Sequence, residues 1–349
     1  MLDKMRKYLQ DAIERKVFPG CVVGVVCGES EHVLAQGHYT FEIDSEPMTS
    51  NSVFDCASIT KSIPVSTVAL QLVDQGQISL SDRMIDYLPE YTGSYREDIK
   101  IKHLLTHTLD FNFRLSGCKD LPPRTILEEI LDVKMKRPPG EIFCYANATS
   151  ILLGMVLERV CGKSLSDLAQ ERIFDPLHMT ETTFFPEKLD ENIVPTEIDS
   201  WRDRVIRGEV HDESAWALRP LMVAGSAGLF STVPNLLSFM DMVLRGGVVD
   251  GKRILSSETI GRMCTNQIAE LPGMSTGLGW ELNQPYMGEK RPPTTIGKTG
   301  FTGCAVIGDR HRRAALVILS NFTWPHRKQD RSLINRVRSD IADILWDSV

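Results

Sequence analysis

Two short apolar runs near opposite ends of the 349-residue chain constrain its fold most strongly. Residues 21–27 form a valine-rich run, and a second run at 33–36 follows after a glycine and charged residues. Near the other end, residues 304–307 and 314–320 have the same character and flank a turn-like sequence at 308–311. Short runs bounded by turn residues are typical of paired strands. We therefore expect both termini to build one antiparallel sheet.

Helical periodicity flanks this sheet and dominates the middle of the chain. Residues 2–17 carry apolar side chains three and four positions apart, and residues 332–346 repeat that spacing, which is the pattern of amphipathic helices. Further helical periods, separated by Pro- and Gly-rich breakers, cover 60–76, 124–134, 148–161 and 164–173. Residues 186–220 show weak periodicity and many charges, so we expect a long loop there.

These patterns predict an α/β fold (α+β): an antiparallel sheet flanked by helices, formed by both termini, with an inserted and mostly helical lobe. We expect a single domain over residues 1–349. Within it, residues 1–57 and about 220–349 would build the α/β lobe, while about 58–219 would build the helical lobe and the long loop.

The chain carries 39 Lys and Arg residues against 46 Asp and Glu, a formal net charge of −7. An acidic balance without a dense basic run argues against nucleic-acid and anionic-membrane partners, and no stretch is long and apolar enough to predict a membrane-spanning helix. The first residues lack the apolar core of a secretory signal, and the eight cysteines lack zinc-site spacing. We therefore expect a cytoplasmic protein with free thiols, or an exported one if a signal precedes this sequence.

Ser58-Ile59-Thr60-Lys61 is a Ser-x-x-Lys pattern at the start of a predicted helix. A serine hydroxyl is a poor nucleophile until a nearby base removes its proton. Residues three apart on a helix share a face, so Lys61 can hydrogen-bond Ser58, and a desolvated lysine can lose its charge and act as that base. The helix N-terminus would also supply backbone N–H groups for a developing oxyanion.

A second Ser-x-x-Lys pattern occurs at Ser116 and Lys119. Such a pattern should arise by chance about once in a few hundred residues. This one lies in a loop before two consecutive prolines, where no predicted helix holds the lysine near the serine. Because geometry must precede chemistry, we interpret this second occurrence as coincidental.

Tyr145-Ala146-Asn147 lies between a Pro-Pro-Gly breaker at 138–140 and the next predicted helix. A tyrosine at such a loop tip can transfer protons if a cation lowers its pKa, and the amide of Asn147 can bind substrate. The alternative is that Asn147 caps the helix while Tyr145 packs on the surface. Taken alone, this segment favours the alternative.

Lys298-Thr299-Gly300 precedes the first of the two C-terminal strands. A lysine and a threonine at a strand edge can bind an anionic group, and a glycine lets substrate approach the backbone closely. The alternative is a surface lysine in a turn, and taken alone this segment favours that alternative. His103 and His107 have the spacing of a metal pair, but no third ligand accompanies them, so we predict no metal site.

In this order, the three motifs resemble those of the serine β-lactamase and penicillin-binding-protein superfamily. The Tyr-x-Asn form and its distance from Ser58 are similar to the class C branch and its related esterases and DD-peptidases. The sequence LLTHT at 104–108 also resembles a stretch of that family. Shorter similar segments lie at 80–82, 140–141, 152–154, 176–179, 224–228 and 277–280. The chain departs from the family pattern at Asp110 and Phe111, and Pro64 interrupts the predicted helix after Ser58.

The resemblance implies that Ser58 is the nucleophile, that Lys61 activates it and that Tyr145 shares in proton transfer. Further substrate-binding residues that it implies are Asn147, Lys298, Thr299, Gly300, Phe301 and His211. The backbone N–H groups of Ser58 and Phe301 would form the oxyanion hole. His211 would also polarise a water for deacylation, unless its ring is simply bonded to a neighbouring backbone group.

We therefore expect a serine hydrolase that cleaves a small ester, amide or peptide through an acyl-Ser58 intermediate, without a cofactor. The positive charge of Lys298 favours substrates with a carboxylate. Carboxylesterase, D-aminopeptidase or DD-carboxypeptidase, and β-lactamase activities all fit this description. The alternative is a penicillin-binding or sensor-type protein that is acylated with little turnover.

Overall fold

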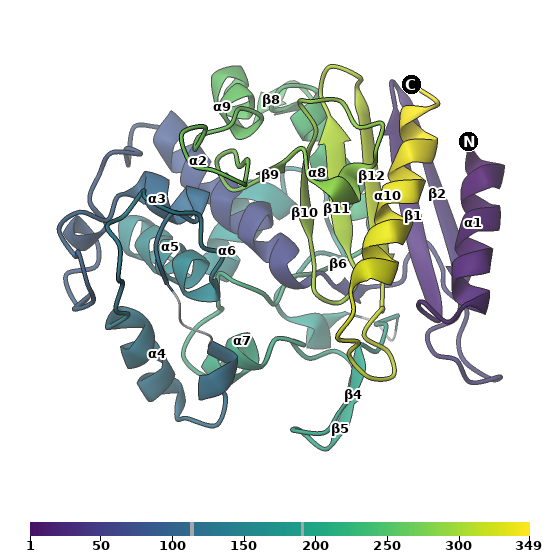
Figure 1. Ribbon diagram of the computed structural model, residues 1–349, viewed down its shortest axis with the longest axis horizontal. Helices are drawn as coiled ribbons and strands as arrows, with labels where there is room; N and C mark the ends of the chain where they lie inside the picture. Colours follow the sequence, from purple (N-terminus) through teal and green to yellow (C-terminus); the bar gives the residue numbers. More distant parts are fainter. Residues whose placement is uncertain (112–114, 190–191) are drawn as a thin grey trace.

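The computed structural model describes residues 1–111, 115–189 and 192–349. Its largest feature is a six-stranded antiparallel sheet that both ends of the chain build together (Figure 1). In spatial order its strands are β2 (Ser30–Gly37), β1 (Gly20–Cys27), β12 (Ala314–Ser320), β11 (Ala305–Asp309), β10 (Ile296–Thr299) and β9 (Glu281–Leu282). The predicted α/β fold, with a sheet formed by both termini, is confirmed.

Strand β1 explains why the two ends of the chain meet. It pairs along its length with β2 on one side and with β12 on the other. Because successive side chains of a strand point to opposite faces, Val23 and Val25 enter one hydrophobic core while Val22 and Val26 enter another. A strand that is buried on both faces needs apolar residues throughout, which is what the run at 21–27 provides.

Helices cover both faces of this sheet. Helices α1 (Leu2–Glu14) and α10 (Ser332–Trp346) pack together on one face, and α8 (Val233–Leu244) covers the other (Figure 1). Helix α8 lies so close to β1 that a Cβ at Gly24 would meet a methyl group of Val233 at 2.4 Å. The two terminal helices predicted from periodicity are therefore present, and α1 ends slightly earlier than expected.

The remaining helices lie mostly in a lobe beside the sheet (Figure 1). They are α2 (Thr67–Asp74), α3 (Ile101–Thr106), α4 (Pro123–Leu131), α5 (Asn147–Cys161), α6 (Leu165–Ala169), α7 (Glu213–Leu218) and α9 (Ser257–Met263). Three small sheets pair β3 (Phe54–Asp55) with β6 (Phe230–Ser231), β4 (Glu197–Asp199) with β5 (Arg204–Ile206), and β7 (Val248–Val249) with β8 (Lys252–Arg253). Across the described ranges, no helix combines the length and apolar character needed to cross a membrane.

The prediction of a single helix over 60–76 is wrong. The chain forms a 3₁₀ turn at Ala57–Lys61, a short π-type turn around Pro64 and only then helix α2. Ile63 has extended backbone angles, with φ −118° and ψ 109°, because a residue before a proline avoids the helical region. Ser58 therefore lies in a 3₁₀ turn and not on a regular α-helix.

Residues 186–220, predicted as one long loop, contain regular structure in their described part. They form the β4–β5 hairpin and helix α7. Asp212 caps α7, because its carboxylate accepts a hydrogen bond from the backbone N–H of Ala215 at 2.9 Å. Each strand of the hairpin has 3 residues and the helix has 6, which is too short for periodicity to identify.

Candidate active site

Ser58 lies in the 3₁₀ turn that joins the sheet to the helical lobe. Asp55 holds this turn, because its buried carboxylate accepts hydrogen bonds of 2.7 Å from the backbone N–H groups of Ala57 and His211. Burial raises the pKa of Asp55 to about 6, although these two donors oppose the rise. Ala57 has a left-handed φ of 46°, which is uncommon outside glycine and stores backbone strain. The clamped turn thus fixes the direction of Ser58.

Lys61 approaches Ser58 as the Ser-x-x-Lys spacing predicts. Its Nζ lies 3.0 Å from Ser58 Oγ and donates a second hydrogen bond, of 2.7 Å, to the backbone carbonyl of Ser226. Lys61 is only 2% exposed. Burial lowers the pKa of its amine, Tyr145 partly offsets this effect, and the charge of Lys298 adds to it. An amine in this environment can give up its proton and accept one from a serine.

The carbonyl of Ser226 comes from the small-residue segment at 224–228, which packs against α5. A Cβ at Gly225 would lie 2.3 Å from the carbonyl oxygen of Ser150, so only glycine permits this close approach. The segment is therefore held against the helix, and its position places a hydrogen-bond acceptor on Lys61.

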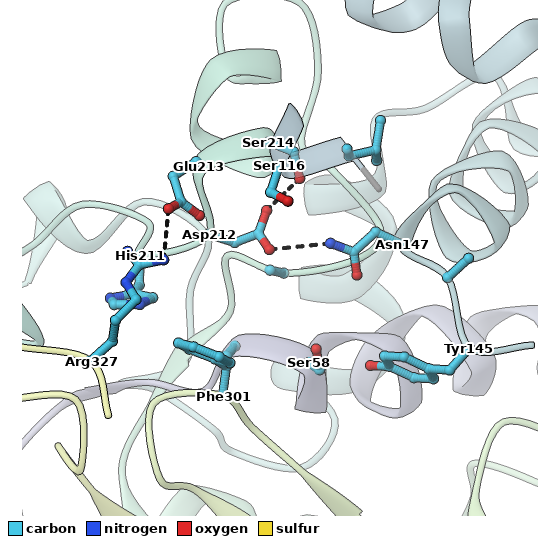
Figure 2. A pocket seen from close by; sticks show the side chains of 14 residues that line it. Ser58, Ser116, Tyr145, Asn147, His211, Asp212, Glu213, Ser214, Phe301 and Arg327 are labelled. Carbon is cyan, nitrogen blue, oxygen red and sulfur yellow. Dashed lines mark hydrogen bonds and ion pairs between the residues drawn. The ribbon is translucent and has the colours of Figure 1, made fainter. Parts of the chain in front are cut away.

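The hydroxyl of Tyr145 points toward Ser58 (Figure 2). Lys298 Nζ lies 4.4 Å from the centroid of the tyrosine ring and Lys61 Nζ lies 5.1 Å from it. Burial raises the pKa of the phenol, but the charges of Lys298 and Lys61, with hydrogen bonds to Ser58 and Lys61, outweigh it and lower the pKa. His107 packs against the ring with centroids 4.9 Å apart. Tyr145 therefore loses its proton more easily than a free tyrosine.

Lys298 forms a buried ion pair that the sequence did not predict. Its Nζ lies 2.7 Å from Glu281 Oε1. Burial lowers the pKa of Lys298, but Glu281 and then Tyr145 outweigh it, so that the pKa is raised. Lys298 and Thr299, predicted to precede a strand, lie within strand β10, which is second from the edge of the sheet. Because β9 pairs with it only at 296–297, Lys298 and Thr299 still lie beyond the end of β9.

Helix α10 holds the turn that follows β10. Arg338 donates hydrogen bonds to the carbonyls of Gly300 and Cys304, at 3.0 and 2.8 Å. Arg331 donates to the carbonyl of Phe301 at 2.9 Å. Two guanidinium groups thus fix the carbonyls of Gly300, Phe301 and Cys304, and these contacts fix the orientation of the turn.

This turn packs directly on the segment that leads to Ser58. A Cβ at Gly300 would lie 2.5 Å from the carbonyl oxygen of Cys56, so a larger residue would push the two segments apart. Within the described chain, the backbone N–H groups of Ser58 and Phe301 donate no hydrogen bond to another protein group. Both groups are therefore available to a substrate oxygen.

Asn147 is the first residue of α5, and the cap position belongs to Ala146. The alternative in which Asn147 caps this helix is therefore wrong by one residue. Its side-chain Nδ2 donates a hydrogen bond of 3.2 Å to Asp212 Oδ2 (Figure 2). This contact fixes the orientation of the amide.

His211 is almost completely buried, with 2% of its surface exposed. Its ring packs on Phe301, with centroids 5.6 Å apart, and burial lowers its pKa to about 4. Within the described chain neither ring nitrogen has a hydrogen-bond partner, since Glu197 Oε2 is 3.6 Å from Nε2. The alternative in which this ring is bonded to a neighbouring backbone group is therefore wrong.

A cavity of about 310 Å³ connects these side chains (Figure 2). The predicted site residues that line it are Ser58, Tyr145, Asn147, His211 and Phe301. A further cavity, of about 280 Å³, also borders Ser58 and has Thr299, Gly300 and Arg331 in its lining. With Lys61 and Lys298 buried beside Tyr145, the structure brings all the predicted site residues together.

The second Ser-x-x-Lys pattern does not form such a pair. Ser116 lies in a 3₁₀ turn and also lines the larger cavity. However, Lys119 Nζ lies 4.8 Å from the ring centroid of Trp201, so this lysine contacts an aromatic ring. His103 accepts a hydrogen bond from a backbone N–H through Nδ1, and the described residues contain no cluster of three side chains that could hold a metal ion.

Sequence reasoning missed Glu281, Asp212 and Ser226, which organise the site. A signal for each lay beside a motif: Glu281 follows the segment at 277–280, Asp212 follows His211, and Ser226 lies within a small-residue segment. Their partners, however, come from distant parts of the chain. Only the folded arrangement identifies which motif residue each one contacts.

Comparisons with known proteins agree with this geometry. The beta-lactamase family model matches residues 5–338. A protein of Escherichia coli (strain K12) named "Putative D-alanyl-D-alanine carboxypeptidase" is 30% identical over 306 residues, which cover 78% of this chain and 70% of that protein. The family-model match thus extends over nearly the whole chain.

Solved structures with low sequence identity share the fold. EstCE1, described as a hydrolase with promiscuous acyltransferase activity, superposes with a TM-score of 0.78 at 20% identity and covers 99% of this chain and 98% of its own. The octameric penicillin-binding protein homologue from Pyrococcus abyssi gives a TM-score of 0.75 at 21% identity, over 92% of this chain and 73% of its own. The predicted superfamily is confirmed. The chain belongs to the beta-lactamase family, a family of serine hydrolases.

Proposed function

We propose that this chain hydrolyses a small ester or amide through a covalent acyl-Ser58 intermediate. The observation that carries the proposal is the 3.0 Å contact between Lys61 Nζ and Ser58 Oγ. Burial lowers the pKa of this lysine, and a neutral amine at hydrogen-bond distance can take the serine proton as the hydroxyl attacks.

In the acylation step, Ser58 Oγ forms a bond to the carbonyl carbon of the substrate. The serine proton passes to Lys61 and reaches the leaving alcohol or amine through Tyr145, as the bond to that leaving group breaks. The negative charge on the carbonyl oxygen is stabilised by the backbone N–H groups of Ser58 and Phe301. Tyr145 suits the transfer because the nearby cations lower the pKa of its phenol.

Deacylation uses the same groups in reverse. A water molecule attacks the acyl carbon and gives one proton to Tyr145, and the bond between that carbon and Ser58 Oγ breaks. The proton returns to Oγ, which restores the enzyme and releases the carboxylic acid. The net reaction consumes one water and requires no other reactant.

We further propose that Arg331, and not Lys298, meets a carboxylate where the leaving group of a substrate carries one. The charge of Lys298 is compensated by Glu281 at 2.7 Å. Arg331 lines the smaller cavity together with Thr299, and within the described chain its guanidinium binds backbone carbonyls and contacts the ring of Phe301. A guanidinium in that position can bind a carboxylate.

The names of the relatives support an acyl-transfer reaction without identifying the substrate. The Escherichia coli relative is named for a peptide substrate, and EstCE1 is described as a hydrolase with acyltransferase activity. Both activities replace one group on a carbonyl carbon with another, which is the step that the geometry around Ser58 supports.

The test is hydrolysis of p-nitrophenyl acetate and of nitrocefin by wild type, Ser58→Ala and, as a control at an exposed serine, Ser50→Ala. We expect steady turnover of at least one substrate, a loss of at least about a thousandfold in Ser58→Ala, and wild-type rates in Ser50→Ala. Equal rates in wild type and Ser58→Ala would contradict the proposal. One equivalent of product followed by a stop would support the sensor-type alternative.

A further inference from the structure

The charged side chains that line the cavity of about 310 Å³ carry an excess of negative charge. Arg327 is the only Lys or Arg among the described residues that line it, and Asp212 and Glu213 line it too. The Arg327 guanidinium bridges two carboxylates, with Nη1 at 2.7 Å from Glu213 and Nη2 at 2.7 Å from Glu197. One positive charge is thus shared between two negative charges, so Arg327 offers little attraction to an anionic substrate.

Within the described chain Asp212 forms no ion pair with a Lys or Arg side chain, although its charge acts to raise the pKa of Lys61. Its carboxylate accepts hydrogen bonds from Ser214 Oγ at 2.6 Å, from the N–H of Ala215 at 2.9 Å and from Asn147 Nδ2 at 3.2 Å. All three donors are neutral. The carboxylate is therefore held in place beside the cavity by neutral donors (Figure 2).

Two further side chains present hydrogen-bond acceptors to the same cavity. The Asn147 amide uses its N–H to bind Asp212, which leaves its carbonyl oxygen free to accept a hydrogen bond. His211 is 2% exposed and lines the cavity, and within the described chain neither of its ring nitrogens has a hydrogen-bond partner, although Nε2 lies 3.6 Å from Glu197 Oε2. A neutral imidazole always offers one acceptor nitrogen, and a buried polar group without a partner is costly. A bound ligand that donates hydrogen bonds would remove that cost.

We infer that this cavity binds an ammonium group on the acyl part of the substrate, with Asp212, Asn147 and His211 as the accepting residues. The chemical class of substrate is then an amino-acyl ester or amide. An ammonium group is a compact cation with three donors and no acceptor, so it matches a cavity that offers a carboxylate and two neutral acceptors. This inference rests on the proposed acyl-Ser58 mechanism and adds the chemistry of the acyl group.

The experiment compares three methyl esters that share a leaving group: alanine methyl ester as both enantiomers, methyl propanoate and monomethyl succinate. Their acyl parts are cationic, neutral and anionic, and acid release at neutral pH gives kcat/KM for each. For wild type we expect the better alanine enantiomer to exceed methyl propanoate by at least about tenfold, the value of one hydrogen bond to a charged group. We expect monomethyl succinate to be the poorest substrate.

Asp212→Asn removes the charge and keeps a residue that can cap α7. It should lower the ratio of alanine ester to propanoate ester by at least about tenfold, while Asp44→Asn, at an exposed carboxylate far along the chain, should leave the ratio at its wild-type value. A wild type that hydrolyses the neutral or anionic ester at least as well would overturn the inference, even if Asp212→Asn failed to fold. An unchanged preference in Asp212→Asn would also overturn it. Hydrolysis that persists in Ser58→Ala would instead refute the acyl-Ser58 mechanism itself.

Discussion

Around Ser58, burial and neighbouring charges set the protonation of each group. Two lysines lie near the same tyrosine ring, yet burial lowers the pKa of Lys61 while Glu281 raises that of Lys298. One lysine is therefore able to act as a base and the other remains a fixed cation that lowers the pKa of Tyr145. The division of roles comes from a single ion pair, of 2.7 Å, that only one of the lysines makes.

Removal of Lys61 tests this division directly. We expect Lys61→Ala to lower kcat/KM for an activated ester by about 10²–10⁴, because a positioned proton acceptor contributes that much. Lys119→Ala is the matched control, since its Nζ contacts the Trp201 ring, and it should leave kcat/KM unchanged. Steady-state kinetics measures kcat/KM for the two variants. Similar losses of kcat/KM in both would count against Lys61 as the base.

The buried ring of His211 should make stability depend on pH. Its pKa is about 4 when folded against 6.5 for a free histidine, so in this window the unfolded chain binds the proton more tightly and stability falls as the pH falls. Between about pH 7 and pH 5, wild type should lose about 2 kcal/mol relative to His211→Gln. Urea unfolding at the two pH values measures the difference. Asp55 titrates in wild type and in His211→Gln alike. If both proteins lost the same free energy of unfolding between the two pH values, His211 would not be the cause of the pH dependence.

At the scale of elements, the turn after β10 depends on contacts from two directions. Arg338 on α10 and Arg331 just before that helix hold its carbonyls, and Gly300 allows it to approach Cys56 on the segment leading to Ser58. Neither contact follows from the Lys-Thr-Gly motif itself. The motif predicts where the turn lies in the chain, whereas its orientation is determined by a helix that begins about thirty residues later.

Gly300→Ala should therefore affect catalysis through this turn. The new Cβ would lie 2.5 Å from the Cys56 carbonyl oxygen and would displace the Phe301 N–H, so we expect kcat to fall by about 10²–10³, as for loss of one oxyanion donor. Gly261→Ala adds a Cβ in α9 that meets nothing within 4 Å and should leave kcat intact. A wild-type kcat for Gly300→Ala would show that the turn is not part of the site.

Helices with a long, regular apolar pattern were predictable from the sequence. Segments in which a single residue changes the backbone were not. The helix at 332–346 is confirmed because its apolar stripe is long and uninterrupted. The predicted helix at 60–76 fails because one proline changes the backbone of the residue before it. Among the site residues, the motif positions were predictable, whereas partners such as Glu281 depend on how distant segments meet.

On the scale of the whole molecule, the sheet ties the two ends of the chain together and places the helical lobe against them. Strands β1 and β12 pair over seven register positions, from Cys21 with Ser320 to Cys27 with Ala314. The turn before Ser58 is held at Asp55 by hydrogen bonds from His211, in the middle of the chain, and from Thr302, near its end. The site therefore requires the complete fold. The division into two lobes and the cytoplasmic location stay predictions.

Stability and catalysis should be separable at positions far from Ser58. Ile341 on α10 is fully buried beneath the sheet, so Ile341→Ala should lower the free energy of unfolding by about 2–5 kcal/mol. Leu333 lies on the same helix but is 44% exposed, and Leu333→Ala should change stability by less than about 0.5 kcal/mol. Denaturant unfolding tests both, and the folded fraction of each variant should keep wild-type specific activity.

The most direct test of the account is to trap the acyl-enzyme. Wild type and Ser58→Ala are mixed with a p-nitrophenyl ester, quenched in acid within the first turnovers, and analysed by intact mass and peptide mapping. We predict an added acyl mass on wild type, located on the peptide containing Ser58, which disappears as substrate is consumed and is absent from Ser58→Ala. An acyl group on another residue, or rapid turnover by Ser58→Ala, would contradict it.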